Sequence, residues 1–308
     1  MVTAVSHYLE SVKDNLSLDL SSETEVIREL ESHIEDRLHD LEESGVSEEE
    51  AANTCIRLLG PAKQLAHQIY EAHSQGTWGQ ALLAAMPHLL FGLLFALNWW
   101  QNVGWFLAML VLVFSVAIYG WRHGRPFWLS PWLGDCLMPV VVSGLFLLCL
   151  PTGWSWLAIA VYVPLALWLV GSITFQTIKR DWLYSSLMLL PMPVAIGWFL
   201  SAQLEGKFPG YSTGLIQGYA PWIGLSFLVL AVAAAVFIRL RQRWLKIAVL
   251  VMSGLLTLTL VCGYGWYRLG LPAFLTLVIT MLALFLTPAL LKRRIKRGEH
   301  RPVARLLP

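Results

Sequence analysis

The chain has 308 residues, of which 56% are hydrophobic and 14% are charged, and its mean hydropathy is +0.60. So apolar a composition excludes an ordinary soluble enzyme of this length and predicts a membrane protein. The formal net charge of +2 conceals an uneven distribution. Residues 1–75 hold 16 of the 20 acidic residues and five basic ones, whereas the remainder holds 17 basic and four acidic residues. An acidic head therefore precedes a basic, apolar body.

The first residues, MVTAVSHYLESVKDN, show no basic segment followed by an apolar run. We therefore expect no cleaved signal peptide and a head that stays in the cytoplasm. Four cysteines stand singly, without CxxC spacing: Cys55, Cys136, Cys149 and Cys262. They are expected to be reduced and structural, and to form neither a metal site nor a disulfide.

Within residues 1–75, apolar residues recur at the three-and-four spacing of four short amphipathic helices. The expected inward positions are Val5, Tyr8, Leu9 and Val12, then Ile27, Leu30, Ile34, Leu38 and Leu41, then Ala51, Cys55, Leu58 and Leu59, and finally Ala62, Leu65, Ala66 and Ile69. Gly45 is expected to end the second helix as a left-handed cap, and Ser47 to begin the third. These patterns predict a small, compact helical domain.

Apolar runs long enough to span a bilayer recur along the rest of the chain. They lie near residues 80–100, 103–121, 132–150, 154–176, 182–203, 220–238, 245–265 and 271–291. The third run is the weakest, because Pro139 and the segment RPFWLSPWLGD blur its start. The sequence therefore predicts an all-α fold. A small four-helix cytoplasmic domain at 1–75 precedes an eight-helix transmembrane bundle at 76–291 and a basic cytoplasmic tail at 292–308.

Basic residues collect in alternate connections, which predicts that these connections lie in the cytoplasm. They are Arg122 and Arg125 after the second run, Lys179 and Arg180 after the fourth, Arg239, Arg241, Arg243 and Lys246 after the sixth, and the tail after the eighth. Both termini are thus expected to be cytoplasmic, in a multi-pass protein of the inner membrane. Contact with anionic lipid is the expected role of Lys292, Arg293, Arg294, Lys296 and Arg297. The alternative is that this tail folds back onto the acidic head.

Ionisable residues within a bilayer are costly and often mark a functional site, and the predicted spans contain few of them. His88 is the one ionisable residue that the sequence places well inside a span. It either bonds a neighbouring helix or serves as a proton relay. Asp135 and Asp181 fall at predicted ends, where Asp181 is expected to pair with the adjacent Lys179 and Arg180.

Two prolines in the fifth predicted span mark another candidate in the membrane. The segment LLPMPVAIG contains Pro191 and Pro193, whose missing N–H groups leave backbone carbonyls open to a ligand. With His88 they define a candidate membrane pocket. No nucleotide-binding, zinc-protease, nucleophile-elbow or paired-carboxylate motif stands at plausible spacing. We therefore expect no enzyme activity, no catalytic residue, no metal and no cofactor.

The head presents a row of carboxylates on the outward side of its second and third predicted helices. They are Glu31, Glu35, Asp36, Asp40, Glu42, Glu43, Glu48 and Glu49. Such a negative field suits a basic partner surface, and it is equally typical of an ordinary solvated helix face. These residues are the candidates for docking a partner.

The segment IRELESHIEDRLHDLEESGVSEEEAANTCIRLLGPAKQLAHQI resembles the HAAS domain, also known as the permease prefix domain. The resemblance covers about residues 5–73 and rests on the order and spacing of Glu31, His33, Asp36, Gly45, Ser47, Glu50, Ala51, Leu59, Gly60 and Pro61. It implies a domain that precedes membrane segments and is often linked with PadR-type transcriptional regulators, and hence a signalling role. Permease-prefix relatives precede FtsX-like permeases. The absence of a large extracytoplasmic domain between the first predicted spans disfavours that class here.

The leading hypothesis is an integral membrane protein whose HAAS-like head docks a cytosolic partner, such as a PadR-type regulator, for signalling. The alternative is a transporter or permease component for a small apolar or lipid-like substrate, with its path near Pro191 and Pro193. A membrane enzyme acting on lipids is the third hypothesis. Membrane lipid is an expected partner of the body, direct binding of nucleic acid is not expected, and no oligomeric state is implied.

Overall fold

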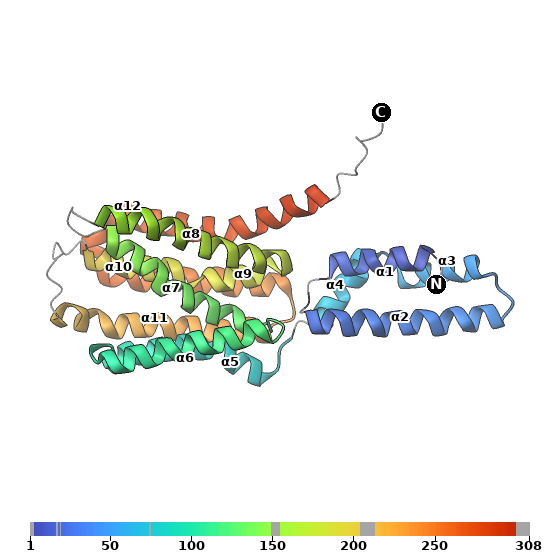
Figure 1. Ribbon diagram of the computed structural model, residues 1–308, viewed down its shortest axis with the longest axis horizontal. Coiled ribbons are helices and arrows are strands. Elements are labelled where there is room, and N and C mark those ends of the chain that lie inside the picture. Colours follow the sequence, from blue (N-terminus) through green and yellow to red (C-terminus); the bar gives the residue numbers. More distant parts are fainter. Residues whose placement is uncertain are drawn as a thin grey trace, which may run out of the picture. The chain divides into compact units, whose positions relative to one another are not determined.

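The computed structural model describes residues 3–16, 18, 20–73, 75–148, 155–203 and 213–299. These residues form twelve α-helices and one short 3-10 helix, and no strand occurs among them, so the all-α prediction is confirmed. The chain separates into two compact units, Met1–Gly76 and Thr77–Pro308. They are called the head unit and the membrane unit below (Figure 1).

The head unit consists of four helices with a small core of their own. They are α1 (Thr3–Asn15), α2 (Leu20–Glu43), α3 (Glu48–Leu59) and α4 (Ala62–His73). The core is formed by Val5, Leu9, Ile34, Leu38, Ala51, Ala52 and Cys55. The apolar stripes of α1, α2 and α3 therefore meet as their three-and-four spacing predicts.

The turn between α2 and α3 has the predicted left-handed glycine. Gly45 has a φ of +85°, a conformation that costs a residue with a Cβ atom about 1 kcal/mol. The Gly45 N–H donates to the carbonyl of Glu42 at 2.9 Å, and the Val46 N–H donates to that of Leu41 at 3.1 Å. These are the two hydrogen bonds of a Schellman motif. Ser47 then caps α3, as the sequence predicts.

The head core differs from the prediction at the end of α3. Leu58 is 67% exposed, because no described residue covers this face in the last turn of the helix, so its expected inward placement is wrong. Tyr70 of α4 is buried and was not expected there. The hydroxyl of Tyr8 donates to the carbonyl of Gly60 at 2.9 Å and ties α1 to the end of α3. Burial raises the pKa of Tyr8, whose hydroxyl is already protonated at neutral pH.

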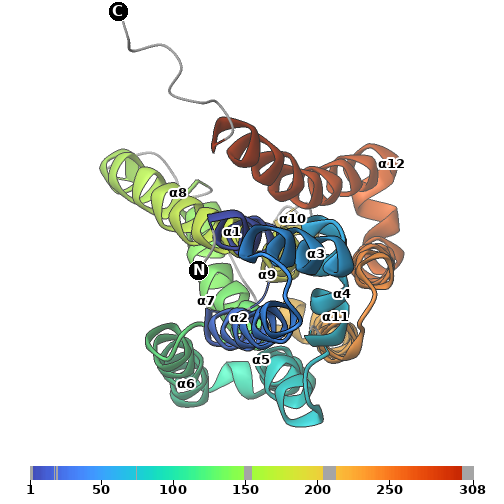
Figure 2. The same ribbon diagram turned by 90° about the vertical axis from the view of Figure 1, so that its right-hand side faces the viewer.

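The membrane unit is a bundle of long helices. They are α5 (Trp78–Ala96), η1 (Trp99–Gln101), α6 (Val103–Arg122), α7 (Leu129–Leu148), α8 (Ser155–Arg180), α9 (Trp182–Leu189), α10 (Pro191–Gln203), α11 (Thr213–Arg239) and α12 (Arg243–Glu299). α12 bends at Gly270, whose φ of 64° and ψ of 171° are not helical, and so contributes two spans. In the end-on view of Figure 2, α6 and α8 lie at the outside of the bundle.

Seven helical segments of the described chain are long and apolar enough to cross a membrane, as in a multi-pass integral membrane protein. They are Trp78–Ala96, Val103–Arg122, Ile159–Lys179, Trp182–Ser201, Gln217–Arg239, Arg243–Tyr264 and Gly270–Arg294. The third run of the sequence corresponds to a shorter apolar helix, Leu129–Leu145, within α7. The prediction of eight spans is therefore not confirmed in full.

The fifth predicted span is broken into α9 and α10 and forms the centre of the bundle. In an 18-residue window of Trp182–Ser201, 83% of the residues are buried, compared with none in the window of Ile159–Lys179. At the break, the Leu190 N–H donates to the carbonyl of Leu187 at 3.3 Å, a bond to the third residue back. Pro191 and Pro193 follow and have no N–H to continue the helical ladder. The prolines thus account for the break.

Two helix pairs approach closely at glycines. α5 packs most extensively against α11, where Gly92 and Gly224 face each other. α7 meets α9 at Gly134, where an added Cβ atom would collide with the backbone carbonyl of Met188. Because the obstacle is backbone, no side-chain movement could relieve this collision. Gly134 therefore sets the distance between α7 and the central helix.

The alternating direction of the helices gathers the α6–α7, α8–α9 and α11–α12 connections at one end of the membrane unit. The guanidinium carbon of Arg239, at the end of α11, lies 4.5 Å from the ring centre of Trp78 at the start of α5. Arg243, which begins α12, forms an ion pair with Asp181 between α8 and α9. This end is called the basic end, and its basic residues include Arg122, Arg125, Lys179, Arg180, Arg239, Arg241, Arg243 and Lys246.

Candidate functional site

A histidine and an aspartate meet inside the membrane unit, both with 0% exposed side chains. Nδ1 of His88 in α5 lies 2.9 Å from Oδ2 of Asp135 in α7, which is a hydrogen-bonding distance. The ring centre of Phe227 in α11 lies 6.4 Å from that of His88, and Phe227 stacks on Phe91. The pair is therefore enclosed by side chains of three helices.

A proline helps to position this pair. Pro87 has no N–H, so the carbonyl of Leu83, one turn earlier in α5, loses its helical partner. The indole Nε1–H of Trp132 in α7 donates to this carbonyl at 2.8 Å instead. Trp132 and Asp135 are three residues apart on one face of α7, so the same contact that satisfies the carbonyl brings Asp135 to His88.

Each member of the pair keeps a buried polar atom that has no hydrogen-bond partner in the described part of the chain. These atoms are Nε2 of His88 and Oδ1 of Asp135. Unsatisfied buried polar atoms are rare in folded proteins because each one costs free energy. An imidazole and a carboxylate at this distance can share a proton, and ionisable residues in a bilayer commonly mark functional sites. The pair is therefore the strongest site candidate among the spans.

A second buried polar cluster lies at the basic end and joins α9 to α12. Oδ1 of Asp181 accepts a hydrogen bond from the Leu183 N–H at 3.2 Å, and Oδ2 lies 3.3 Å from Nη2 of Arg243. Lys246 stands one helical turn beyond Arg243 and is fully buried. Its Nζ lies 3.4 Å from the hydroxyl of Tyr184. Two cations of α12 thus meet two polar groups of the central span.

These clusters change two expectations from the sequence. Asp135 was expected at the end of a span, but it lies fully buried in the second turn of α7, because Gly134 lets α7 approach the central helix. Lys246 was expected in the cytoplasmic connection after the sixth span, but its side chain is fully buried in the bundle. For Asp181, the structure adds an ion pair with Arg243, 62 positions away, which the sequence does not indicate.

The three residues of the candidate membrane pocket lie in two helices. His88 belongs to α5, and Pro191 and Pro193 begin α10. All three are buried. The pocket that they were expected to share stays a prediction.

The eight candidate docking residues lie in α2 and the first turn of α3, where Glu31 is half-buried and the other seven are exposed. Five of them flank the turn between the two helices and are called the acidic corner: Asp40, Glu42, Glu43, Glu48 and Glu49. The Schellman turn at Gly45 brings the two groups of carboxylates together on the head unit.

The helix dipole distinguishes the two sides of the acidic corner. Glu48 and Glu49 lie in the first turn of α3, where negative charge stabilises a helix. Asp40, Glu42 and Glu43 lie at the end of α2, where negative charge opposes the dipole and no basic residue stands in the last turn. Glu43 lies 3.4 Å from Nε2 of His39 one turn earlier, whereas the stability of α2 does not explain Asp40 and Glu42.

Of the five candidate lipid-contact residues, three have described side chains. Lys292 is half-buried, and Arg293 and Arg294 are exposed, all in the last part of α12. The side chains of Lys296 and Arg297, and the chain from residue 300 onward, lie outside the described residues, so folding of the tail onto the head stays a prediction.

Three of the four cysteines lie within the described residues. Cys55, Cys136 and Cys262 are free and buried, and Cys149 lies outside the described residues. Burial raises the pKa of the Cys55 thiol, which lowers its reactivity. No group of three or more His, Cys, Asp or Glu side chains in the described chain is placed to hold a metal ion.

No protein-family model, curated protein or solved structure matches this chain.

Sequence reasoning missed the pairing of α9 with α12, although a weak signal exists. Asp181 and Tyr184 are three residues apart, as are Arg243 and Lys246, so each helix presents two polar groups one turn apart. The sequence alone does not show that these two helices lie side by side in the fold. The Trp132 contact is harder to foresee, because the chain has 15 tryptophans that could serve the carbonyl that Pro87 leaves open.

Proposed function

We propose that this chain is a multi-pass membrane protein whose head unit docks a cytosolic protein with a basic surface and thereby couples the membrane to a signalling process. A PadR-type transcriptional regulator is the partner that the HAAS resemblance favours. The proposal assigns binding and no enzyme activity. It requires that the head unit faces the cytoplasm, as the distribution of basic residues in the membrane unit predicts.

The acidic corner is the observation that carries this proposal. Its carboxylates are exposed, and those at the end of α2 oppose the dipole of their own helix. A set of charges that costs helix stability is better explained by a partner than by solvation alone. Clustered negative charge raises the rate of association with a basic surface. Salt screens this attraction and weakens it.

The test is crosslinked affinity purification of the full chain from native membranes, compared with a chain that lacks residues 1–75. The proposal expects a cytosolic regulator that crosslinks to the full chain alone. Its yield should fall steeply as the salt present before and during crosslinking is raised from about 0.05 to 0.5 M, because the Debye length shortens several-fold over this range. Identical membrane proteins and no cytosolic protein in both samples would overturn the proposal.

The buried His88–Asp135 pair supports a second candidate function, a transporter or permease component for a lipid-like substrate. The carboxylate and the imidazole lie 2.9 Å apart among apolar helices, and each retains an unsatisfied polar atom within the described chain. Two such atoms could bind a polar headgroup or carry a proton as the helices move. The pair thus places two ionisable groups in the interior of the bundle, in spans that contain few of them.

Flux in proteoliposomes tests this second function. A fluorescently labelled phospholipid in the outer and inner leaflets reports transbilayer movement when a membrane-impermeant reductant quenches the outer label. A transporter of lipid-like substrates should accelerate this movement over protein-free vesicles, and Asp135→Asn should remove the acceleration. Equal quenching kinetics with and without the protein would exclude the function.

A further inference from the structure

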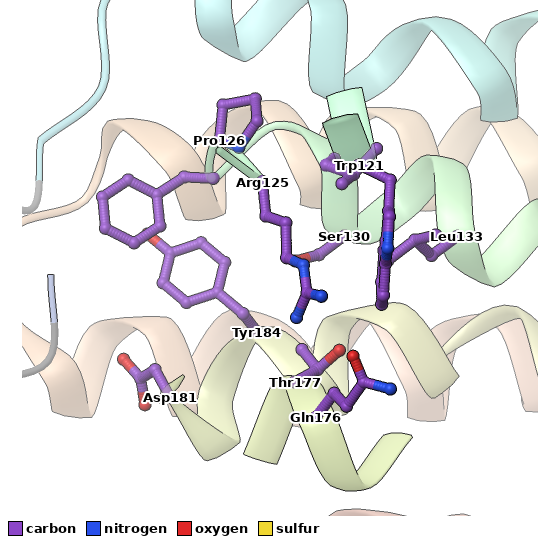
Figure 3. A pocket seen from close by; sticks show the side chains of 11 residues that line it. Trp121, Arg125, Pro126, Ser130, Leu133, Gln176, Thr177, Asp181 and Tyr184 are labelled. Atoms are coloured by element: carbon purple, nitrogen blue, oxygen red, sulfur yellow. The ribbon is translucent and has the colours of Figure 1, made fainter. Parts of the chain in front are cut away.

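The basic end of the membrane unit contains a pocket that neither proposed function uses. It lies between the end of α6, the α6–α7 connection, the end of α8 and the start of α9 (Figure 3). Its empty volume is about 430 Å³, part of which is open to the exterior. The polar side chains in its lining are Arg125, Ser130, Gln176, Thr177, Asp181 and Tyr184.

Arg125 is held in a defined position in this pocket. It follows Gly124 and has a φ of 56°, which is uncommon for a residue other than glycine, and its N–H donates to the carbonyl of Gly120 at 3.0 Å. Its guanidinium carbon lies 3.8 Å from the ring centre of Trp121. Figure 3 shows the guanidinium extending across the pocket towards Thr177 and Gln176. A planar guanidinium fixed in this way presents a fork of donors that matches a phosphate group.

The charges around the pocket favour an anion. Asp181 is the acidic residue of the lining, and Arg243 compensates its carboxylate at 3.3 Å. Behind the lining, the ammonium of Lys246 lies 3.4 Å from the hydroxyl of Tyr184. At and behind the lining, the one carboxylate of Asp181 thus stands among three basic side chains, those of Arg125, Arg243 and Lys246.

The surroundings of the pocket suit a lipid headgroup. Trp121 and Phe127 flank it, and Leu129 and Leu133 supply an apolar wall. The pocket lies where Val103–Arg122 ends and Trp182–Ser201 begins, which is the level of headgroups for helices that cross a bilayer. Basic pockets between helices at this level bind anionic headgroups in membrane proteins.

We infer that this pocket binds a phosphate group, with Arg125 as its principal contact and with the hydroxyls of Ser130 and Thr177 beside it. The phosphate is that of an anionic lipid headgroup or inorganic phosphate, and the two sources are separated by the experiment below. This site belongs to the membrane unit alone and does not depend on the docking function of the head unit.

The experiment measures thermal unfolding of the full chain in neutral detergent by tryptophan fluorescence. One arm titrates phosphatidic acid, with phosphatidylcholine as the zwitterionic comparison, and the other titrates inorganic phosphate. Each titration is repeated on three variants, Arg125→Gln, Arg125→Lys and Arg122→Gln. Arg125→Lys keeps the positive charge but removes the paired donors of the guanidinium. Arg122 is a matched control because it is exposed near the pocket and is not part of its lining. Shifts are measured against each variant's own ligand-free melting temperature.

The inference expects a saturable rise in melting temperature. Arg125→Gln should raise the half-saturating concentration about tenfold or more, Arg125→Lys should raise it less, and Arg122→Gln should leave it within about twofold. Saturation with phosphatidic acid alone identifies a lipid headgroup, and saturation with inorganic phosphate identifies the free anion. The inference is overturned if neither probe gives a saturable shift, if phosphatidylcholine acts equally in all variants, or if Arg122→Gln weakens binding as much as Arg125→Gln.

Discussion

The carboxylate of Asp135 and the imidazole of His88 share one buried contact in the interior of the membrane unit. Burial removes both groups from water, so each depends on the other for its polar interaction. Removing one partner leaves the other uncompensated, whereas removing both also removes the desolvation cost. The pair therefore predicts an asymmetry between single and double substitutions.

Asp135→Val is expected to lower the free energy of unfolding by about 3 kcal/mol, because it leaves His88 buried without its partner. The double variant His88→Leu with Asp135→Val should recover most of this loss. The measurement is equilibrium unfolding of the detergent-solubilised chain in SDS, followed by tryptophan fluorescence. A double variant as unstable as the sum of the two single variants would show that the residues contribute independently.

For single residues, the sequence identifies candidate site residues more readily than it identifies the residues that contact them. His88 could be placed inside a span because it interrupts a long apolar run. Its partner could not be chosen, because Asp135 is 47 positions away and stands in a segment whose start is blurred by polar residues. Likewise, the left-handed φ of Gly45 follows from local turn chemistry, whereas the burial of Lys246 depends on a distant helix.

At the scale of helices, apolar composition locates the spans but not their neighbours. Trp182–Ser201 and Ile159–Lys179 have nearly equal hydropathy, yet the first is central and the second is peripheral. In a bilayer, lipid-facing and protein-facing surfaces are both apolar, so hydropathy cannot separate them. Small residues indicate more about which helices are neighbours, since Gly134 permits the close approach of α7 to α9. Leu58 in the head unit is a similar case. The spacing of apolar residues predicts which face of α3 carries its side chain, but not whether other residues bury that face.

Gly134→Ala should lower the free energy of unfolding by about 1–3 kcal/mol, because the new methyl group meets the backbone carbonyl of Met188 and separates α7 from α9. Gly171→Ala is the matched control, since nothing lies within 4 Å of an added Cβ atom in α8. It should change stability by less than about 1 kcal/mol. Comparable losses in thermal unfolding for the two variants would contradict the close contact.

At the scale of the whole molecule, two units of opposite charge and contrasting polarity share one chain. The contrast is visible in composition, because the carboxylates concentrate before residue 76 and the apolar spans follow. The head unit has a core of its own, so its exposed charges are free to serve recognition. The proposed function places this recognition at the acidic corner, which sequence patterns describe only as a row of outward carboxylates.

Charge reversal at the acidic corner tests the docking proposal most directly. The variant Glu42→Lys with Glu43→Lys is compared with Glu10→Lys and Asp14→Lys, which reverse the same number of exposed carboxylates on α1. The measurement is the yield of the crosslinked cytosolic partner from native membranes at low salt. The proposal predicts about a three- to tenfold loss for the corner variant and little change for the α1 variant. Equal yields from both variants and the unmodified chain would contradict docking at the acidic corner.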